Sequence, residues 1–380
     1  MILRAKHFAT EKMIDVYCEP GKIISVGNPD NSITPDLTAM YVAPALFDLQ
    51  INGALGIAFS DINLEQSGIK EVLALCKKHG ISGICPTIIT NSHEVLIHGF
   101  NTLRKACESD SAINKAMPCF HLEGPYISSE DGPRGAHLKQ FVRHPNYEEF
   151  QQYQKASGNR IKLLTLAPEL PSAIEFIKKL SQSGVVVALG HTAASPQIIR
   201  EAIQAGAKLS THLGNGSHAL WPRHENYFWE QLASDSLSAS FIPDGHHLPA
   251  ALIKAIVRVK PASKQIITCD ASSLAGLPAG KYRQWGQDIE VLLSGKVVVP
   301  GTPFLAGSGS FTDQCVAHLV SLNLVPISQI IEMATNAPRR LLGLPEIKIE
   351  TGGIADLLLF DSDKEHPFLV KKLLLDGKLV

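Results

Sequence analysis

Three apolar runs, Ile161–Ala167 (IKLLTLA), Val185–His191 (VVVALGH) and Ala207–His212 (AKLSTH), alternate with amphipathic stretches of helical length. This alternation is typical of a parallel α/β sheet. Five further runs continue it along the chain: Tyr41–Gln50, Ile81–Thr87, Met117–Glu123, Leu237–Asp244 and Gln265–Asp270. Eight such units fit a (β/α)8 TIM barrel, and no glycine-rich dinucleotide fingerprint follows the first run. We therefore predict an α/β protein in which residues 44–345 form a catalytic (β/α)8 barrel.

The two ends of the chain differ from its middle. Residues 1–43 and 346–380 contain short apolar or alternating segments that are separated by Gly, Pro, Asn and Asp. This pattern predicts short strands joined by turns. Neither end has enough strands to be stable alone, so we expect both termini to form one small β-sandwich domain together.

The composition excludes several classes of function. The 380 residues are 45% hydrophobic, and 35 Lys+Arg are balanced by 36 Asp+Glu, so neither a nucleic-acid partner nor a charged membrane patch is expected. No apolar run approaches the ~18 residues of a membrane span, and no signal peptide is recognisable. The seven cysteines form no Cys-x-x-Cys pair. These features predict a soluble protein in the cytoplasm.

Polar side chains end six of the eight runs. They are Asp48-x-Gln50-x-Asn52, His121-Leu122-Glu123, Gly190-His191-Thr192, Thr211-His212-Leu213, Asp244-Gly245-His246-His247 and Cys269-Asp270-Ala271. In a TIM barrel the carboxyl ends of all strands surround one mouth, where active sites lie. We therefore expect these side chains to converge on a single site.

Glu123, His191 and His212 are candidate metal ligands. Two imidazoles and a carboxylate are ligand types that Zn²⁺ and Fe²⁺ prefer, and three ligands leave room for water and substrate. Each residue alone could equally be a surface hydrogen-bonding group, but their positions after three separate strands favour a metal. His121 shares a strand face with Glu123 and is as readily a core histidine as a ligand.

Asp270 stands at the end of the last run, after Ile266-Ile267-Thr268-Cys269. Beside a metal-bound water, this carboxylate could accept a proton as general base and return it to a leaving amine. The alternative role is to orient other groups of the site.

Motifs along nearly the whole chain resemble those of the N-acetylglucosamine-6-phosphate deacetylases, a family of the amidohydrolase superfamily. They are Pro44-Ala45-Leu46-Phe47-Asp48, His121-Leu122-Glu123-Gly124-Pro125-Tyr126, Gly135-Ala136-His137, Leu166-Ala167-Pro168-Glu169, Gly190-His191-Thr192, Thr211-His212-Leu213-x-Asn215, Asp244-Gly245-x-His247, Asp270-Ala271, Leu305-Ala306-Gly307-Ser308 and Gly352-Gly353-Ile354-Ala355-Asp356-Leu357. The stretch from His121 to Pro125 is specific to this family, whereas the last motif marks only the superfamily.

The resemblance implies roles for individual residues. Glu123, His191 and His212 match the metal ligands, and Asp270 matches the catalytic acid/base. The implied substrate contacts are His137, Asn215, Gly216, Arg223, His247 and Leu305. Gln50 and Asn52 replace the His-x-His pair that holds a second metal in many superfamily members. One divalent metal per subunit is therefore expected, most simply Zn²⁺, with Fe²⁺ or Co²⁺ as alternatives.

The loop after His212 departs from the family pattern. It reads Asn215-Gly216-Ser217 in place of Asn-Ala-Met, and Arg223-His224-Glu225-Asn226 in place of Arg-Glu-Pro-Gly. Arg223 stands where the resemblance implies a phosphate-binding arginine, which would act in its own subunit or across a homodimer.

The expected reaction is hydrolysis of N-acetyl-D-glucosamine 6-phosphate to glucosamine 6-phosphate and acetate, with this small amino sugar phosphate as the partner. One alternative is a deacetylase of another N-acetyl amino sugar, phosphorylated or not, with the same mechanism. Others are a cyclic-amide hydrolase of the same superfamily and a catalytically inactive sugar-binding regulator.

Overall fold

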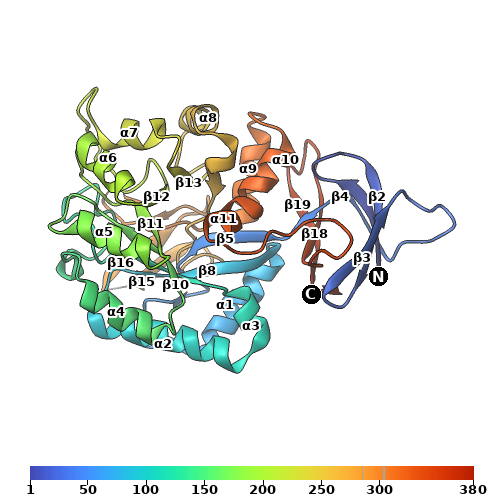
Figure 1. The fold of residues 1–380 in the computed structure, drawn as a ribbon, viewed down its shortest axis with the longest axis horizontal. Helices are drawn as coiled ribbons and strands as arrows, with labels where there is room; N and C mark the ends of the chain where they lie inside the picture. The colour runs from blue at the N-terminus through green and yellow to red at the C-terminus, as the bar shows by residue number, and fades with distance from the viewer. Residues whose placement is uncertain (285, 303) are drawn as a thin grey trace.

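The middle of the chain forms one parallel sheet of eight strands in the computed structural model, which describes residues 1–284, 286–302 and 304–380 (Figure 1). The strands are β5 (Leu46–Ile51), β8 (Ile81–Ile89), β9 (Phe120–Glu123), β10 (Ile161–Leu166), β11 (Val186–Leu189), β12 (Ala207–Ser210), β13 (Ser238–Phe241) and β14 (Gln265–Ile267). Each pairs with its neighbour in sequence order, and a parallel bridge from Ile51 to Ala271 joins the first strand to the segment after the last. All eight predicted strands are present, and the predicted barrel is confirmed.

Helices lie between and outside the strands (Figure 1). They are α1 (Gln66–Lys78), α2 (His93–Ser109), α3 (Ser111–Ala116), α4 (Tyr147–Ala156), α5 (Ala173–Gln182), α6 (Pro196–Gln204), α7 (Tyr227–Ala233), α8 (Ala250–Val259), α9 (Thr312–Ser321), α10 (Ile327–Met333) and α11 (Asn336–Leu341). In α5, the buried residues Ala173, Phe176, Ile177 and Leu180 recur at helical spacing, so one face packs on the sheet. Within the described ranges, no helix is both long and apolar enough to cross a membrane.

Both ends of the chain pair in a separate seven-stranded sheet, as predicted. Its order is β20 (Lys378–Leu379), β19 (Leu369–Leu375), β18 (Leu357–Asp361), β4 (Leu37–Pro44), β1 (Ile2–His7), β2 (Met13–Glu19) and β3 (Lys22–Gly27). Leu3, Val16 and Leu357 lie in the buried core of this sheet. Figure 1 shows it at one end of the molecule, with β4 leading into β5 of the barrel. The domain boundaries at 43/44 and 345/346 stay a prediction.

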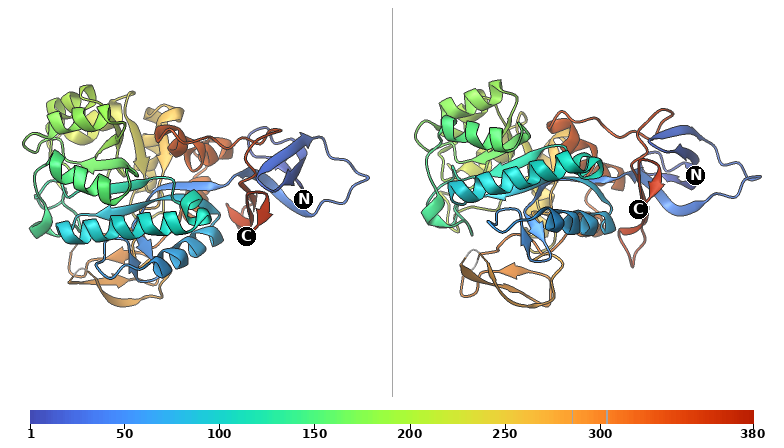
Figure 2. Two further views of the ribbon diagram at one scale, coloured as in Figure 1. Left: turned by 60° about the horizontal axis from the view of Figure 1, so that its bottom comes forward. Right: turned by 90° about the horizontal axis from the view of Figure 1, so that it is seen from below.

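A lobe that the sequence analysis did not predict lies between β14 and α9. Its strands β15 (Gly280–Gln284), β16 (Gln287–Val291) and β17 (Val297–Val298) form an antiparallel sheet, which Figure 2 shows beside the barrel. The short hairpin β6 (Gly53–Ala54) and β7 (Ile57–Ala58) was not predicted either. The strands of the lobe bury few apolar side chains, such as Ile289 and Val297, so they carry little of the periodic signal that identifies a strand.

Candidate active site

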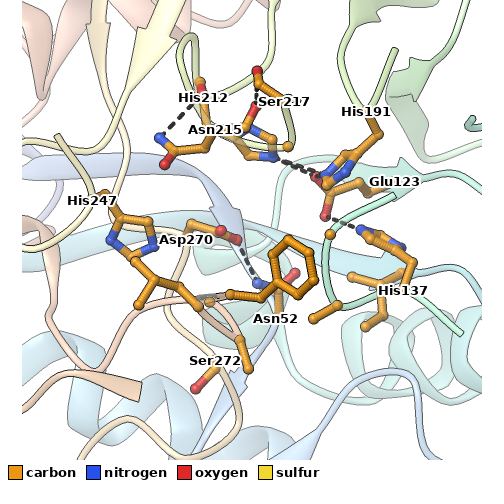
Figure 3. Close-up of a pocket in the computed structure, with 18 of the residues that line it drawn as sticks. Asn52, Glu123, His137, His191, His212, Asn215, Ser217, His247, Asp270 and Ser272 are labelled. Atoms are coloured by element: carbon orange, nitrogen blue, oxygen red, sulfur yellow. Dashed lines mark hydrogen bonds and ion pairs between the residues drawn. The ribbon is translucent and has the colours of Figure 1, made fainter. Parts of the chain in front are cut away.

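The predicted site residues gather at the carboxyl ends of the barrel strands (Figure 3). They line a pocket of about 320 Å³, whose predicted members are Glu123, His137, His191, His212, Asn215, Gly216, His247, Asp270 and Leu305. Arg223 is the exception, because it is exposed on the loop before α7 and does not line this pocket. The convergence expected from the strand ends is therefore observed for nine of the ten predicted residues.

Glu123, His191 and His212 form a compact buried cluster. One ligand atom from each lies within 4.8 Å of the others. Oε1 of Glu123 is 3.2 Å from Nε2 of His191 and 3.0 Å from Nε2 of His212, and the two ring nitrogens are 3.1 Å apart. Three side chains, one in a strand and two just beyond the ends of their strands, thus direct their ligand atoms at one point (Figure 3).

The hydrogen bonds of this cluster test whether it fits a cation. Nδ1 of His191 is 2.8 Å from the carbonyl oxygen of Pro133, which can only accept, so Nδ1 carries the proton. When this ring is neutral, its Nε2 carries the lone pair that a metal can bind. Burial would raise the pKa of Glu123, but hydrogen bonding and charge from the two imidazoles outweigh it and hold this pKa well below its usual range. An ionised carboxylate oxygen that meets two imidazole nitrogens at one point is a donor set that fits a divalent metal.

Asp270 lies beside this cluster and is held by two amides. Its Oδ1 accepts hydrogen bonds from Asn52 Nδ2 at 2.7 Å and Gln50 Nε2 at 3.0 Å. Gln50 Nε2 also donates to Glu123 Oε1 at 2.9 Å. Burial, and next the charge of Glu123, raise the pKa of Asp270 to about 6. A carboxyl with a pKa near neutrality can both accept and return a proton.

The backbone turns at three of these residues explain why their strands end early. His191, His212 and Asp270 have φ of 51°, 31° and 51°, a left-handed conformation that non-glycine residues rarely adopt. Such residues cost roughly 1–3 kcal/mol each and cluster at functional sites. The sequence analysis ran the strands through these positions. The strands stop two or three residues earlier, because a left-handed residue cannot continue a pleated strand.

The other predicted contacts surround the cluster. Nδ1 of His247 is 2.8 Å from Asp244 Oδ2, so its Nε2 is the ring nitrogen left for a ligand. Burial would raise the pKa of Asp244, but hydrogen bonding and charge from His247 hold it well below normal. Gly216 has φ of +55°, and a Cβ there would lie 2.7 Å from Nδ1 of His191, so this position requires glycine.

Two further histidines are buried and neutral. Burial, and next the charge of His191, lower the pKa of His137 to about 3, while its Nδ1 bonds Thr90 Oγ1 at 2.8 Å. His121 contacts Thr87 Oγ1 at 3.2 Å and Thr165 Oγ1 at 2.8 Å, one through each ring nitrogen. Of its two readings, the structure therefore supports the core histidine.

Sequence reasoning missed the residues that the lobe and the segment after it bring to the pocket. Lys296 and Phe304 line it. The Ser294-Gly295 pair before Lys296 is typical of a turn, but a turn does not indicate which part of the barrel its hairpin will face.

The chain combines a barrel, a β-domain formed by its two termini, and a His/carboxylate cluster at the strand ends. This combination defines a hydrolase of the amidohydrolase superfamily. No protein-family model matches the chain. An N-acetylglucosamine-6-phosphate deacetylase of Bos taurus is 32% identical over 359 residues, covering 91% of this chain and 84% of that protein. One of Lysinibacillus sphaericus is 28% identical over 369 residues, covering 94% and 91%. The chain belongs to the N-acetylglucosamine-6-phosphate deacetylase family.

Solved structures agree with this assignment. The crystal structure of N-acetyl-D-glucosamine-6-phosphate deacetylase from Mycobacterium smegmatis has a TM-score of 0.90 at 26% identity, with all of both chains covered. A mutant of that mycobacterial enzyme was solved in complex with N-acetyl-D-glucosamine-6-phosphate. A dihydroorotase reaches a TM-score of 0.61 at 14% identity and shares only the fold.

Proposed function

We propose that this protein is a metal-dependent deacetylase that hydrolyses N-acetyl-D-glucosamine 6-phosphate to glucosamine 6-phosphate and acetate. The observation that carries the proposal is the convergence of Glu123, His191 and His212 within 4.8 Å, with Asp270 in the same pocket. Family membership and the ligand bound in the mycobacterial mutant support the choice of substrate.

The site residues would divide the chemistry between them. Glu123, His191 and His212 would hold one divalent metal, which we propose to be Zn²⁺. When bound, it would lower the pKa of a water molecule and polarise the acetamide carbonyl. Asp270 takes the proton of the attacking water and returns it to the leaving amine. Asn52 and Gln50 both donate to Oδ1 of Asp270, which leaves Oδ2 as the oxygen for proton transfer.

Substrate contacts come from loops around the cluster. Nε2 of His247 would hydrogen-bond the carbonyl or the sugar, because Asp244 occupies Nδ1. His137, Asn215, Gly216 and Leu305 would form the walls that contact the sugar phosphate, since they line the same pocket.

We also propose a homodimer in which Arg223 reaches the pocket of the neighbouring protomer. Arg223 lies outside the pocket of its own chain. Large apolar side chains on the same part of the surface are exposed, Leu220 by 90% and Trp229 by 49%, as expected for an interface. A cytoplasmic location stays a prediction of the sequence.

A second candidate function is deacetylation of an unphosphorylated N-acetyl amino sugar. The position of Arg223 favours it, because this arginine would contribute nothing to the site of an isolated protomer. Parallel assays of acetate release from N-acetylglucosamine and its 6-phosphate separate the two functions. An inactive regulator is disfavoured by the complete set of metal-ligand and acid/base residues.

We predict one tightly bound divalent metal per chain. The amide nitrogens of Gln50 and Asn52 already donate to carboxylates, and neither side chain can replace the imidazoles of a second site. Elemental analysis of the purified protein should therefore give one equivalent. Two equivalents, or a crystal structure with a second metal touching Asn52, would show that this assignment is wrong.

Replacing Arg223 with Ala should raise KM for the 6-phosphate strongly and change kcat little. One charge-assisted hydrogen bond contributes roughly 1.5–3 kcal/mol of binding free energy. When a contact stabilises the bound substrate and the transition state equally, its loss raises KM and leaves kcat unchanged. Steady-state kinetics on both sugars measures the effect, with exposed Arg258 in α8 replaced by Ala as the control. An equal rise in KM for both sugars, or no rise for either, would show that Arg223 does not bind the phosphate.

A further inference from the structure

The unpredicted lobe brings a lysine to the active-site pocket. Lys296 stands immediately before β17, and it lines the pocket together with Phe304 and Leu305 of the segment that returns toward the barrel. Its side chain is half-buried. Figure 2 shows the lobe as a separate unit beside the barrel, so it reaches the pocket from outside the ring of strands.

Hydrogen bonds fix the turn that carries Lys296. The backbone N–H of Leu292 donates to the carbonyl of Lys296 at 2.9 Å, and that of Gly295 donates to the carbonyl of Leu292 at 2.9 Å. Nε2 of His246 donates to the carbonyl of Ser294 at 3.1 Å. His246 is the neighbour of His247, so the tip of the hairpin is tied to the loop that carries a proposed substrate contact.

The charged residues of the pocket indicate what kind of ligand this lysine could bind. Among the described lining residues, Lys296 is the one Lys or Arg, and Glu123 and Asp270 are the carboxylates. Within the described part of the chain, Nζ of Lys296 has no hydrogen-bond or ion-pair partner, although its backbone N–H bonds Ser294 Oγ at 3.4 Å. Phosphate is bound in proteins by cationic side chains, lysine among them, and Arg223 of the same chain lies outside the pocket.

We propose that Lys296 binds the 6-phosphate of the substrate and determines the preference for a phosphorylated sugar. The inference rests on the proposed function and adds a cation from the same chain to the one expected from Arg223 across a dimer. A lysine ammonium on a flexible stem acts as a point charge and needs no fixed orientation toward phosphate. His246 acts as a positioning residue, because its Nε2 is bound to the carbonyl of Ser294 in the turn.

The test compares Lys296→Met with a matched control, Lys281→Met. Methionine keeps an unbranched apolar stem and removes the charge. Lys281 lies in β15 of the same lobe, is exposed and does not line the pocket. For each protein, kcat and KM are measured on N-acetylglucosamine 6-phosphate and on N-acetylglucosamine, at low and high ionic strength. A Lys296→Arg protein tests rescue by charge.

We expect Lys296→Met to reduce the preference for the phosphorylated sugar, the ratio of the two kcat/KM values, by roughly tenfold or more. The loss should fall mainly on KM, and the salt dependence of kcat/KM should become shallower, because salt screens the missing attraction. Lys296→Arg should retain most of the preference, and Lys281→Met all of it.

An unchanged preference in Lys296→Met would overturn the inference, as would an equal loss for both sugars or the same drop in Lys281→Met. These outcomes differ from failure of the proposed function. In that case the wild-type protein itself would release no acetate from N-acetylglucosamine 6-phosphate, whatever residue stands at position 296.

Discussion

A Glu123→Ala protein is expected to lose its metal and nearly all of its deacetylase activity together. Oε1 of Glu123 is the atom that both imidazoles approach, at 3.2 Å and 3.0 Å. Without it, the proposed metal loses the one carboxylate among its three ligands, and only the two imidazoles remain. Even residues that only support metal ligands typically change affinity by about 10–100-fold, so removal of a ligand should cost more. Elemental analysis and an activity assay on the same gel-filtered sample measure both losses.

His121→Gln is the matched control for this prediction. His121 lies two residues before Glu123 on β9 and is buried, but threonines occupy both of its ring nitrogens. The variant should therefore keep its metal even if its stability falls. A full equivalent of metal in Glu123→Ala, or loss of metal in His121→Gln with the fold intact, would contradict the assignment of ligands.

An Asp270→Asn protein is expected to keep its metal and its affinity for substrate but lose turnover. The amide oxygen of Asn can still accept from Asn52 and Gln50, as Oδ1 of Asp270 does. Its nitrogen would replace Oδ2 and cannot accept a proton. Loss of a general acid/base typically lowers the rate by ~10²–10⁴-fold.

Steady-state kcat, together with calorimetric binding of N-acetylglucosamine 6-phosphate, measures this split. Binding should stay within a few-fold of wild type while kcat falls. If kcat also stays within a few-fold, Asp270 only orients other groups, and another base must take the proton.

Most of the barrel could be predicted because its signal is periodic. Buried parallel strands such as β11 (Val186–Leu189) are continuous apolar runs, and helices such as α5 repeat their apolar residues at helical spacing. The exact strand ends could not be predicted. The left-handed turns at His191, His212 and Asp270 are imposed by the surrounding structure. His and Asp adopt this conformation more often than most residues, but too rarely for residue type alone to locate it.

The centre of the site could also be predicted, because the barrel brings all strand ends to one mouth. Its rim could not. Lys296 reaches the pocket through a hairpin with few buried apolar residues. The turn of this hairpin is held by a contact between Ser294 and His246, which are 48 residues apart in the sequence. Arg223 occupies the position implied by the family resemblance but lies outside the pocket of its own chain.

Release of acetate from N-acetylglucosamine 6-phosphate decides whether this protein is a metal-dependent deacetylase. Protein freed of metal and reloaded with Zn²⁺, Fe²⁺ or Co²⁺ is incubated with the phosphorylated and the unphosphorylated sugar, and acetate and free amine are quantified. We expect equal amounts of acetate and glucosamine 6-phosphate, dependence on added metal, and a higher kcat/KM for the phosphorylated sugar. Absence of acetate with every metal, or undiminished activity in the metal-free protein, would contradict this expectation.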